Sequence, residues 1–340
     1  MTQVHEAEPD ELIFMKNNVL IFSLFLAVTI GGGIAIETTN AEGELKLSDL
    51  MGPLLLWAIV LFPLLYFPMI RIFKMIKSSS STPRKKLNDG RGQQLDERLK
   101  EMEGERLSAE QRKIIADNVG LYHWLPEKLI NPWEERILVF LENFHFTDMA
   151  HGPVTEEMRL LVAAEACLLI VRRPLSDYRH LQRIHLWKDV IEGAEGAAGT
   201  ATRHDVNLSW KNLMDTISCA RGGYNLTLHE FAHVIDFADD GIAQSIPVGR
   251  DSADYDEWEK LVDEEHAKLV DTYDSNSSYP IRAYATLVAR DGTRPEFFSC
   301  ATSAFFERGS RVKRQCPNVY ELFKKFYGVD PASWRKQKRV

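Results

Sequence analysis

Two histidines and a glutamate form an HExxH pattern within an apolar stretch of the chain. On an α-helix, His229 and His233 lie one turn apart on the same face, so both imidazoles can reach a single zinc ion. Glu230 lies beside them, where a carboxylate can take a proton from water. The spacing predicts a zinc site with a general base. The alternative interpretation is an amphipathic helix that carries two surface histidines.

The residues around the motif favour a helix. Asn225 suits the N-cap position, and Gly241 supplies a stop. Asp236 follows His233 by three residues and His229 by seven, so all three share one face. The Asp236 carboxylate either orients a zinc-binding imidazole or caps the end of the helix, and the sequence leaves both roles open.

A third zinc ligand is expected from a second helix further along the chain. Zinc enzymes with HExxH usually need one more protein ligand and leave the fourth position to water. In RPEFFSCATSAFFERG, residues 294–309, Pro295 suits the first helical turn and the apolar residues recur at helical spacing. Glu296 opens this helix. It is either the third ligand or a carboxylate that complements the helix dipole.

Length and composition limit the class of protein. The chain has 340 residues, 26% charged and 45% hydrophobic, which is ordinary for a globular protein with a substantial core. The net charge of -8, and the lack of a basic stripe interleaved with aromatic residues, argue against direct binding of nucleic acid. The four cysteines form no CxxC pair, so a reducing compartment fits best.

Two uncharged segments near the start of the chain predict membrane helices. Residues 19–36 and 51–70 carry no charged side chain. Each is long enough to cross a hydrocarbon core of about 30 Å. Residues 1–18 are polar and acidic, unlike the basic start of a signal peptide. We therefore expect a two-helix transmembrane hairpin over residues 19–70, in contact with the lipid bilayer.

The charges that flank the hairpin predict its orientation. The loop 37–50 is acidic and contains one basic residue, Lys46, whereas the stretch after residue 70 is rich in Lys and Arg. By the positive-inside rule, the basic side faces the cytoplasm. The alternative is that these basic residues form a solvated linker. We expect a two-pass protein of the cytoplasmic (inner) membrane, with both termini and the folded domain facing the cytoplasm.

The rest of the chain divides into a linker region over residues 71–120, basic and polar with charged helices, and a folded domain over 121–340. Thr155 suits the N-cap of a buried core helix that Pro174 stops. EERILVFLENFHF, from residue 134, is compatible with another amphipathic helix. The runs 183–187 and 205–210 are candidate strands, and residues 255–270 read as a charged surface helix.

Four stretches of the chain occur in order: TEEMR at 155–159 leading into LVAAEACLL, then GGYNLTLHEFAHVIDFADDG, then PEFFSCATSAFFERG, and finally YELFKKFYGVDP. The similarity that they carry covers roughly residues 125–331. Together they resemble the Mlc titration factor A family of glucose-regulated zinc metallopeptidases. The resemblance implies an α+β, mostly helical zincin-like domain with a small sheet. It also implies that one zinc ion is held by His229, His233 and Glu296, with Glu230 as the general base.

The chain departs from this family pattern in three places. Ser303 stands where a Glu is expected, which removes a contact behind the ligands. Tyr284 corresponds to a tyrosine before the EFF segment, but the interval that follows it is longer than usual. We expect Tyr284 to stabilise the oxyanion of the reaction; the alternative is a tyrosine packed in the core. Soluble members of the family also lack the membrane hairpin.

These observations predict a membrane-anchored zinc-dependent peptidase that acts on a peptide or protein substrate. The alternative is a regulatory binding protein, because the resemblance implies a soluble member that sequesters a transcriptional regulator. In that case catalysis would be weak or vestigial. The intact HExxH motif and Glu296 favour the peptidase, whereas Ser303 leaves room for the alternative.

Overall fold

A computed structural model of the chain describes residues 90–149, 152–194, 196–238, 241–274, 279–289 and 292–338. The expected membrane segments, 19–36 and 51–70, lie outside these residues, so the hairpin and its orientation stay predictions. Among the helices that the structure describes, none combines the length and the apolar character needed to cross a membrane.

A four-stranded sheet with the order β1-β2-β4-β3 lies on one side of the HExxH helix. The strands are β1 (His145–Met149), β2 (Arg183–Trp187), β3 (Gly199–Ala201) and β4 (Asp205–Ser209). β1, β2 and β4 run parallel, and β3 pairs antiparallel with β4 at the edge. The parallel pairing sets Ile184 opposite Val206, and both are buried.

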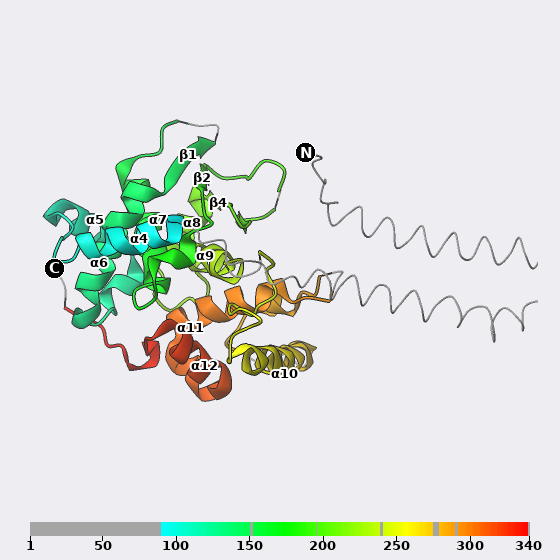
Figure 1. Cartoon of the computed structure of the whole chain (residues 1–340). Coiled ribbons are helices and arrows are strands. Elements are labelled where there is room, and N and C mark those ends of the chain that lie inside the picture. Colours follow the sequence, from blue (N-terminus) through cyan, green and yellow to red (C-terminus); the bar gives the residue numbers. More distant parts are fainter. Residues whose placement is uncertain are drawn as a thin grey trace, which may run out of the picture. The chain divides into compact units, whose positions relative to one another are not determined.

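Helices make up most of the described chain, and α8 and α9 contact the sheet (Figure 1). They are α4 (Gly90–Glu101), α5 (Ala109–Asn118), α6 (Glu127–Asn143), α7 (Glu156–Leu169), α8 (Trp210–Ile217), α9 (Leu226–Asp236), α10 (Tyr255–Asp274), α11 (Pro295–Gln315) and α12 (Pro317–Tyr327). Figure 1 shows α9 between the sheet and α11, and it contacts both. A mostly helical α+β fold with a small sheet, as expected, is therefore confirmed.

Elements with clear local signals lie where the sequence predicts them. The Thr155 hydroxyl accepts from the amide of Met158 at 3.2 Å and caps α7, whose last ten residues are all buried. Residues 183–187 form β2. The second candidate strand ends at Ser209, because the Ser209 hydroxyl caps α8 and accepts from the amide of Asn212 at 3.3 Å.

Two parts of the fold differ from the expectation. The helix predicted from residue 134 through FHF begins earlier and ends at Asn143, and His145–Met149 pairs with β2 as a strand. The linker region predicted over residues 71–120 includes α4 and α5, which belong to the compact unit that starts at Asn88. Their side chains Leu95 and Ile115 are buried in its core, so the boundary at residue 120 lies inside the folded unit.

α9 is held in an aromatic core that extends over both of its neighbours. On the α6 side, the ring of Phe231 lies 5.8 Å from Phe140 and 5.4 Å from Tyr178, measured between centroids. On the α11 side, Phe298 lies 5.7 Å from Trp258. Aromatic pairs at such distances stabilise a core beyond the area that they bury. These contacts pack α9 against α6 and α11 against α10.

A buried carboxyl group ties α7 to the start of α9. Glu165 is fully buried, and its Oε1 accepts a hydrogen bond from the side-chain amide of Asn225, the N-cap of α9. Burial raises the pKa of Glu165 to about 7, although the amide of Asn225 favours the ionised form. The folded chain thus binds this proton more tightly than the unfolded chain does.

Protonated Glu165 stabilises the folded state relative to the unfolded state. This stabilisation is complete below the ordinary pKa of 4.5 and is lost as the pH rises through about 7. Between about pH 5 and pH 8, we expect this group to lower the free energy of unfolding by on the order of 2–3 kcal/mol. Glu165→Gln, neutral at every pH, should lose this part of the pH dependence. Glu157→Gln, at an exposed position of α7, should retain it.

Denaturant unfolding of the three proteins at both pH values measures the effect. Equal pH dependence of the unaltered chain and Glu165→Gln would show that Glu165 ionises as easily in the folded state as in the unfolded state.

Candidate metal centre

The HExxH residues lie on a helix whose beginning and burial are well defined. The Asn225 side chain accepts from the amide of Leu228 at 2.9 Å, so α9 begins where the sequence predicts. His229, Glu230 and His233 are only 5%, 4% and 7% exposed. The alternative of two surface histidines is therefore wrong.

Glu296, in the first turn of α11, meets both imidazoles. Its Oε2 lies 3.2 Å from Nε2 of His229 and 3.4 Å from Nε2 of His233. Tetrahedral zinc with bonds of about 2.1 Å places two of its ligand atoms about 3.4 Å apart. The Glu296 Oε2 is also buried and makes no hydrogen bond within the described residues. Both nitrogen–oxygen distances therefore suit ligands of one zinc ion, with the carboxylate of Glu296 common to the two.

The protonation states of His229 and Glu296 suit metal ligands. Burial lowers the pKa of His229 to about 4, so its imidazole is neutral. Burial opposes ionisation of Glu296, but the two imidazoles outweigh it and lower the pKa to about 2. For His233, burial disfavours the charged form, yet Glu296 raises the pKa above its usual value. An ionised carboxylate beside imidazole nitrogens is the ligand chemistry that zinc takes.

Glu230 lies against the edge strand β3. Burial raises its pKa to about 7, opposed by His233 and reinforced by Glu296. A Cβ atom added at Gly199 would lie 2.6 Å from Oε1 of Glu230, closer than real Cβ contacts allow. The missing side chain at position 199 therefore gives the Glu230 carboxylate its space.

Asp236 connects the end of α9 with the start of α11. Its Oδ2 accepts from the amide of Ser245 at 2.8 Å. The Ser245 hydroxyl in turn accepts from the amide of Phe298 at 2.8 Å and donates to the carbonyl of Arg294. Asp236 thus fixes the loop that positions the first turn of α11, and its charge also helps to raise the pKa of His233.

Two residues of α11 that the sequence motifs did not single out also reach the imidazoles. The hydroxyl of Ser299 lies 3.0 Å from Nδ1 of His233, and Sγ of Cys300 lies 4.0 Å from Nδ1 of His229. His229, Glu296 and Cys300 each have a possible ligand atom within 4.8 Å of the others. Burial raises the pKa of the Cys300 thiol, so it stays protonated at neutral pH. The four-residue spacing of Glu296 and Cys300 was the available signal.

The open side of the site carries aromatic residues and one cation. Tyr284, in the 3-10 turn Ala283–Thr286, is 48% exposed, and its ring lies 6.2 Å from that of His229. A tyrosine packed in the core is therefore excluded. The guanidinium carbon of Arg282 lies 3.9 Å from the ring centroid of Tyr224, and that ring lies 5.8 Å from His229.

The family of glucose-regulated metallo-peptidases M90 matches residues 93–328, which contain the whole cluster. The uncharacterized protein slr2042 of Synechocystis sp. is 27% identical over 255 residues, 70% of this chain and 90% of that protein. Mlc titration factor A of Edwardsiella ictaluri is 30% identical over 151 residues, 44% of this chain and 52% of that protein. Its counterpart in Pectobacterium atrosepticum is 26% identical over 152 residues, with the same coverage.

The similarity to the two titration factors thus spans about half of their length. The family match is wider, because it runs from the helix α4 to the end of α12. It includes the HExxH helix and the helix that carries Glu296. On this evidence, the chain belongs to the glucose-regulated metallo-peptidase M90 family.

Proposed function

We propose that this chain is a zinc-dependent peptidase that hydrolyses peptide bonds in a peptide or protein substrate. One observation carries the proposal: Nε2 of His229 and of His233 both lie within 3.4 Å of Oε2 of Glu296. These three residues would hold one zinc ion and leave a position open to water. Membership in a metallo-peptidase family supports the same conclusion.

Zinc bound there would supply a Lewis acid that acidifies water and polarises the scissile carbonyl. Glu230 would take the proton of the attacking water and deliver it to the leaving amine. A carboxyl whose pKa is about 7 can do both near neutral pH, because neither protonation state is strongly favoured. The exposed hydroxyl of Tyr284, beside His229, is in a position to donate to the oxyanion.

The alternative is a regulatory binding protein, and the name of the titration factors among the relatives supports it. Binding alone would not require a carboxylate between two buried imidazoles. It would also not require a neutral His229 or a Glu230 of raised pKa. These features are typical of a catalytic zinc site, and they favour the peptidase.

Two isosteric variants separate catalysis from metal binding. Glu230→Gln should retain zinc and lower kcat by about 10²–10⁴-fold, because it removes only the base. Glu296→Gln should weaken zinc affinity by more than the roughly 10- to 100-fold typical of residues that merely support a ligand. Metal analysis of the purified protein and cleavage of a broad peptide library measure the two effects. Equal cleavage by the unaltered chain and Glu230→Gln would exclude the peptidase.

In the same series, Tyr284→Phe keeps the ring and removes the hydroxyl. It should retain zinc, leave KM nearly unchanged and lower kcat by less than Glu230→Gln does. Unchanged kcat would exclude Tyr284 from the reaction.

The close approach of β3 to the base gives an independent test. Gly199→Ala should displace the Glu230 carboxylate, since the new Cβ would lie 2.6 Å from Oε1. We expect kcat to fall at least about tenfold while the metal content is unchanged, because a base must lie within hydrogen-bond reach of its proton. Thr200→Ser, a change in the same strand, is the matched control. Unchanged kcat in Gly199→Ala would show that Glu230 does not need its present position.

We also propose that residues 19–70 anchor the peptidase to the cytoplasmic membrane with both termini in the cytoplasm. Support comes from the uncharged segments 19–36 and 51–70 and from the basic residues that follow them. Reporter fusions at Val340 and within residues 37–50 should report opposite sides of the membrane. A cytoplasmic signal from the 37–50 fusion would contradict this topology.

A further inference from the structure

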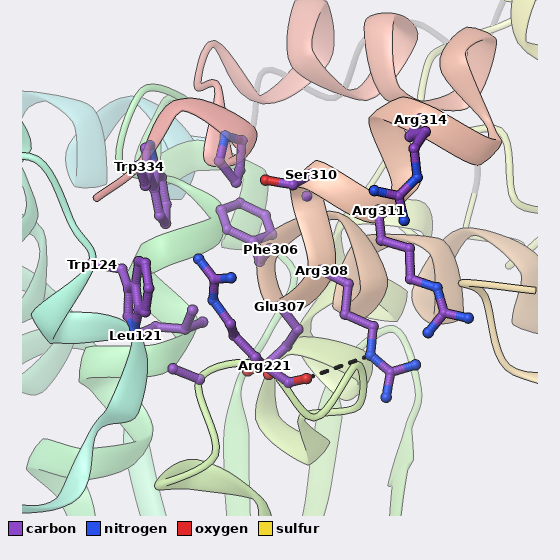
Figure 2. A pocket seen from close by; sticks show the side chains of 13 residues that line it. Leu121, Trp124, Arg221, Phe306, Glu307, Arg308, Ser310, Arg311, Arg314 and Trp334 are labelled. Atoms are coloured by element: carbon purple, nitrogen blue, oxygen red, sulfur yellow. Dashed lines mark hydrogen bonds between the residues drawn. The ribbon is translucent and has the colours of Figure 1, made fainter. Parts of the chain in front are cut away.

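A pocket of about 390 Å³ lies apart from the candidate metal centre (Figure 2). It forms where the chain before α9 meets the second half of α11 and the C-terminal segment. None of the proposed zinc ligands lines it. Its lining is strongly basic, with the side chains Arg221, Arg308, Arg311 and Arg314, and it also includes the hydroxyl-bearing Ser310.

The arginines reach the pocket from two segments that are far apart in the sequence. Arg308 lies at a kink of α11, with a φ of -126° and a ψ of 32°, and Arg311 and Arg314 follow on the last turns of the same helix. All three line the pocket. Figure 2 shows Arg311 and Arg314 on the side opposite Trp124, while Nε of Arg308 donates to the backbone carbonyl of Arg221 at 3.5 Å. The guanidinium carbon of Arg221 lies 3.8 Å from the ring centroid of Trp124, which holds that side chain in place.

Three of the four arginines of this pocket keep their positive charge without a carboxylate partner among the described residues. In the part of the chain that the structure describes, Arg221, Arg308 and Arg314 form no ion pair with a carboxylate. The one acid in the lining is Glu307, only 3% exposed. Burial, reinforced by the nearby Glu165, raises the pKa of Glu307 to about 8, so at neutral pH it is mostly uncharged.

Glu307 also has an unused hydrogen-bonding position. Its Oε2 accepts from the amide of Gly222 at 2.9 Å. Its Oε1 is buried and has no hydrogen-bond partner among the described residues. Glu307 lines the pocket, and in its neutral form its carboxyl group can donate one hydrogen bond to an anion.

We propose that this pocket binds the phosphoryl group of a small phosphate monoester. A guanidinium presents its donors in a planar fork that matches phosphate oxygens, and several such forks around one concave site suit a dianion. The volume lies in the range of small-molecule sites. A duplex nucleic acid would instead need an extended basic surface on a chain whose net charge is -8.

A bound phosphate would contact the turn that leads into the HExxH helix. Arg308 donates to the carbonyl of Gly222, and a Cβ atom at Gly223 would lie 2.2 Å from Nε of Arg308. Gly223 has a φ of +79°, which favours glycine. An anion that draws Arg308 toward itself would compete with this contact. We therefore expect hydrogen exchange at residues 222–224 to change when the ligand binds.

Calorimetric titration of the full chain with glycerol 3-phosphate tests the proposal, with glycerol as the uncharged analogue and inorganic phosphate as the minimal ligand. Arg221→Ala and Arg314→Ala should each weaken binding at least about tenfold. Lys313→Ala removes a cation of α11 that does not line the pocket, and its Kd should stay within about twofold of the unaltered chain. Both arginines are exposed, so thermal unfolding of their variants should be unchanged.

Several results would overturn the proposal. These are no heat of binding at about 10 mM glycerol 3-phosphate, or a loss in Lys313→Ala equal to that in Arg314→Ala. Binding only to vesicles that contain phosphatidic acid would assign the arginines to a membrane surface instead. Binding only to duplex DNA, with a steep salt dependence, would assign them to nucleic acid. None of these results depends on peptidase activity.

Discussion

The contact of the Glu296 carboxylate with the imidazoles of His229 and His233 is the constraint on which the arrangement of α9 and α11 depends. An ionised group with little access to water is costly unless charged or polar partners surround it. Here the partners come from α9, so α9 and α11 must cross in one register. Aromatic contacts pack α9 against α6 and α11 against α10, and the hydrogen bonds from Asp236 through Ser245 tie the end of α9 to the first turn of α11. The burial of apolar side chains thus offsets the free energy needed to remove these polar groups from water. The polar groups themselves contribute little to the stability of the fold.

The start of α9 depends on a second set of buried polar groups. The side-chain oxygen of Asn225 accepts from the backbone amide of Leu228 and caps α9, and its side-chain NH₂ group donates to Glu165. Three residues earlier, the amide of Gly222 donates to Glu307 and its carbonyl accepts from Arg308. The cap of the HExxH helix and the basic pocket therefore share one short stretch of chain. Any change in the pocket that moves Gly222 is transmitted to α9 through covalent bonds, without a long chain of packed side chains.

Features set by local rules could be predicted from the sequence, whereas features set by distant pairing could not. Caps and spacing located α9 at Asn225 and α11 at Pro295, and the four-residue spacing identified His229 and His233. β1 was missed because its five residues, HFTDM, carry no clear strand pattern and form a strand by pairing with β2. Ser299 reaches His233 across 66 positions in sequence, and the basic pocket combines Arg221 with arginines more than 80 residues later. These contacts between residues that are distant in sequence follow from how the helices cross, and no local sequence pattern predicts that crossing.

The departure at Ser303 can be understood from the same helix start. Its hydroxyl donates to the carbonyl of Asn225 at 3.3 Å, so this position of α11 still contacts the N-cap residue. Glu165 and Glu307 are already buried near it, and the charge of Glu165 contributes to the raised pKa of Glu307. A third carboxyl group beside them would either add like charge or take up another proton. A small hydroxyl avoids that conflict and leaves the imidazoles untouched. Ser303 therefore affects the N-cap of α9, and it contributes no ligand atom to the candidate metal centre.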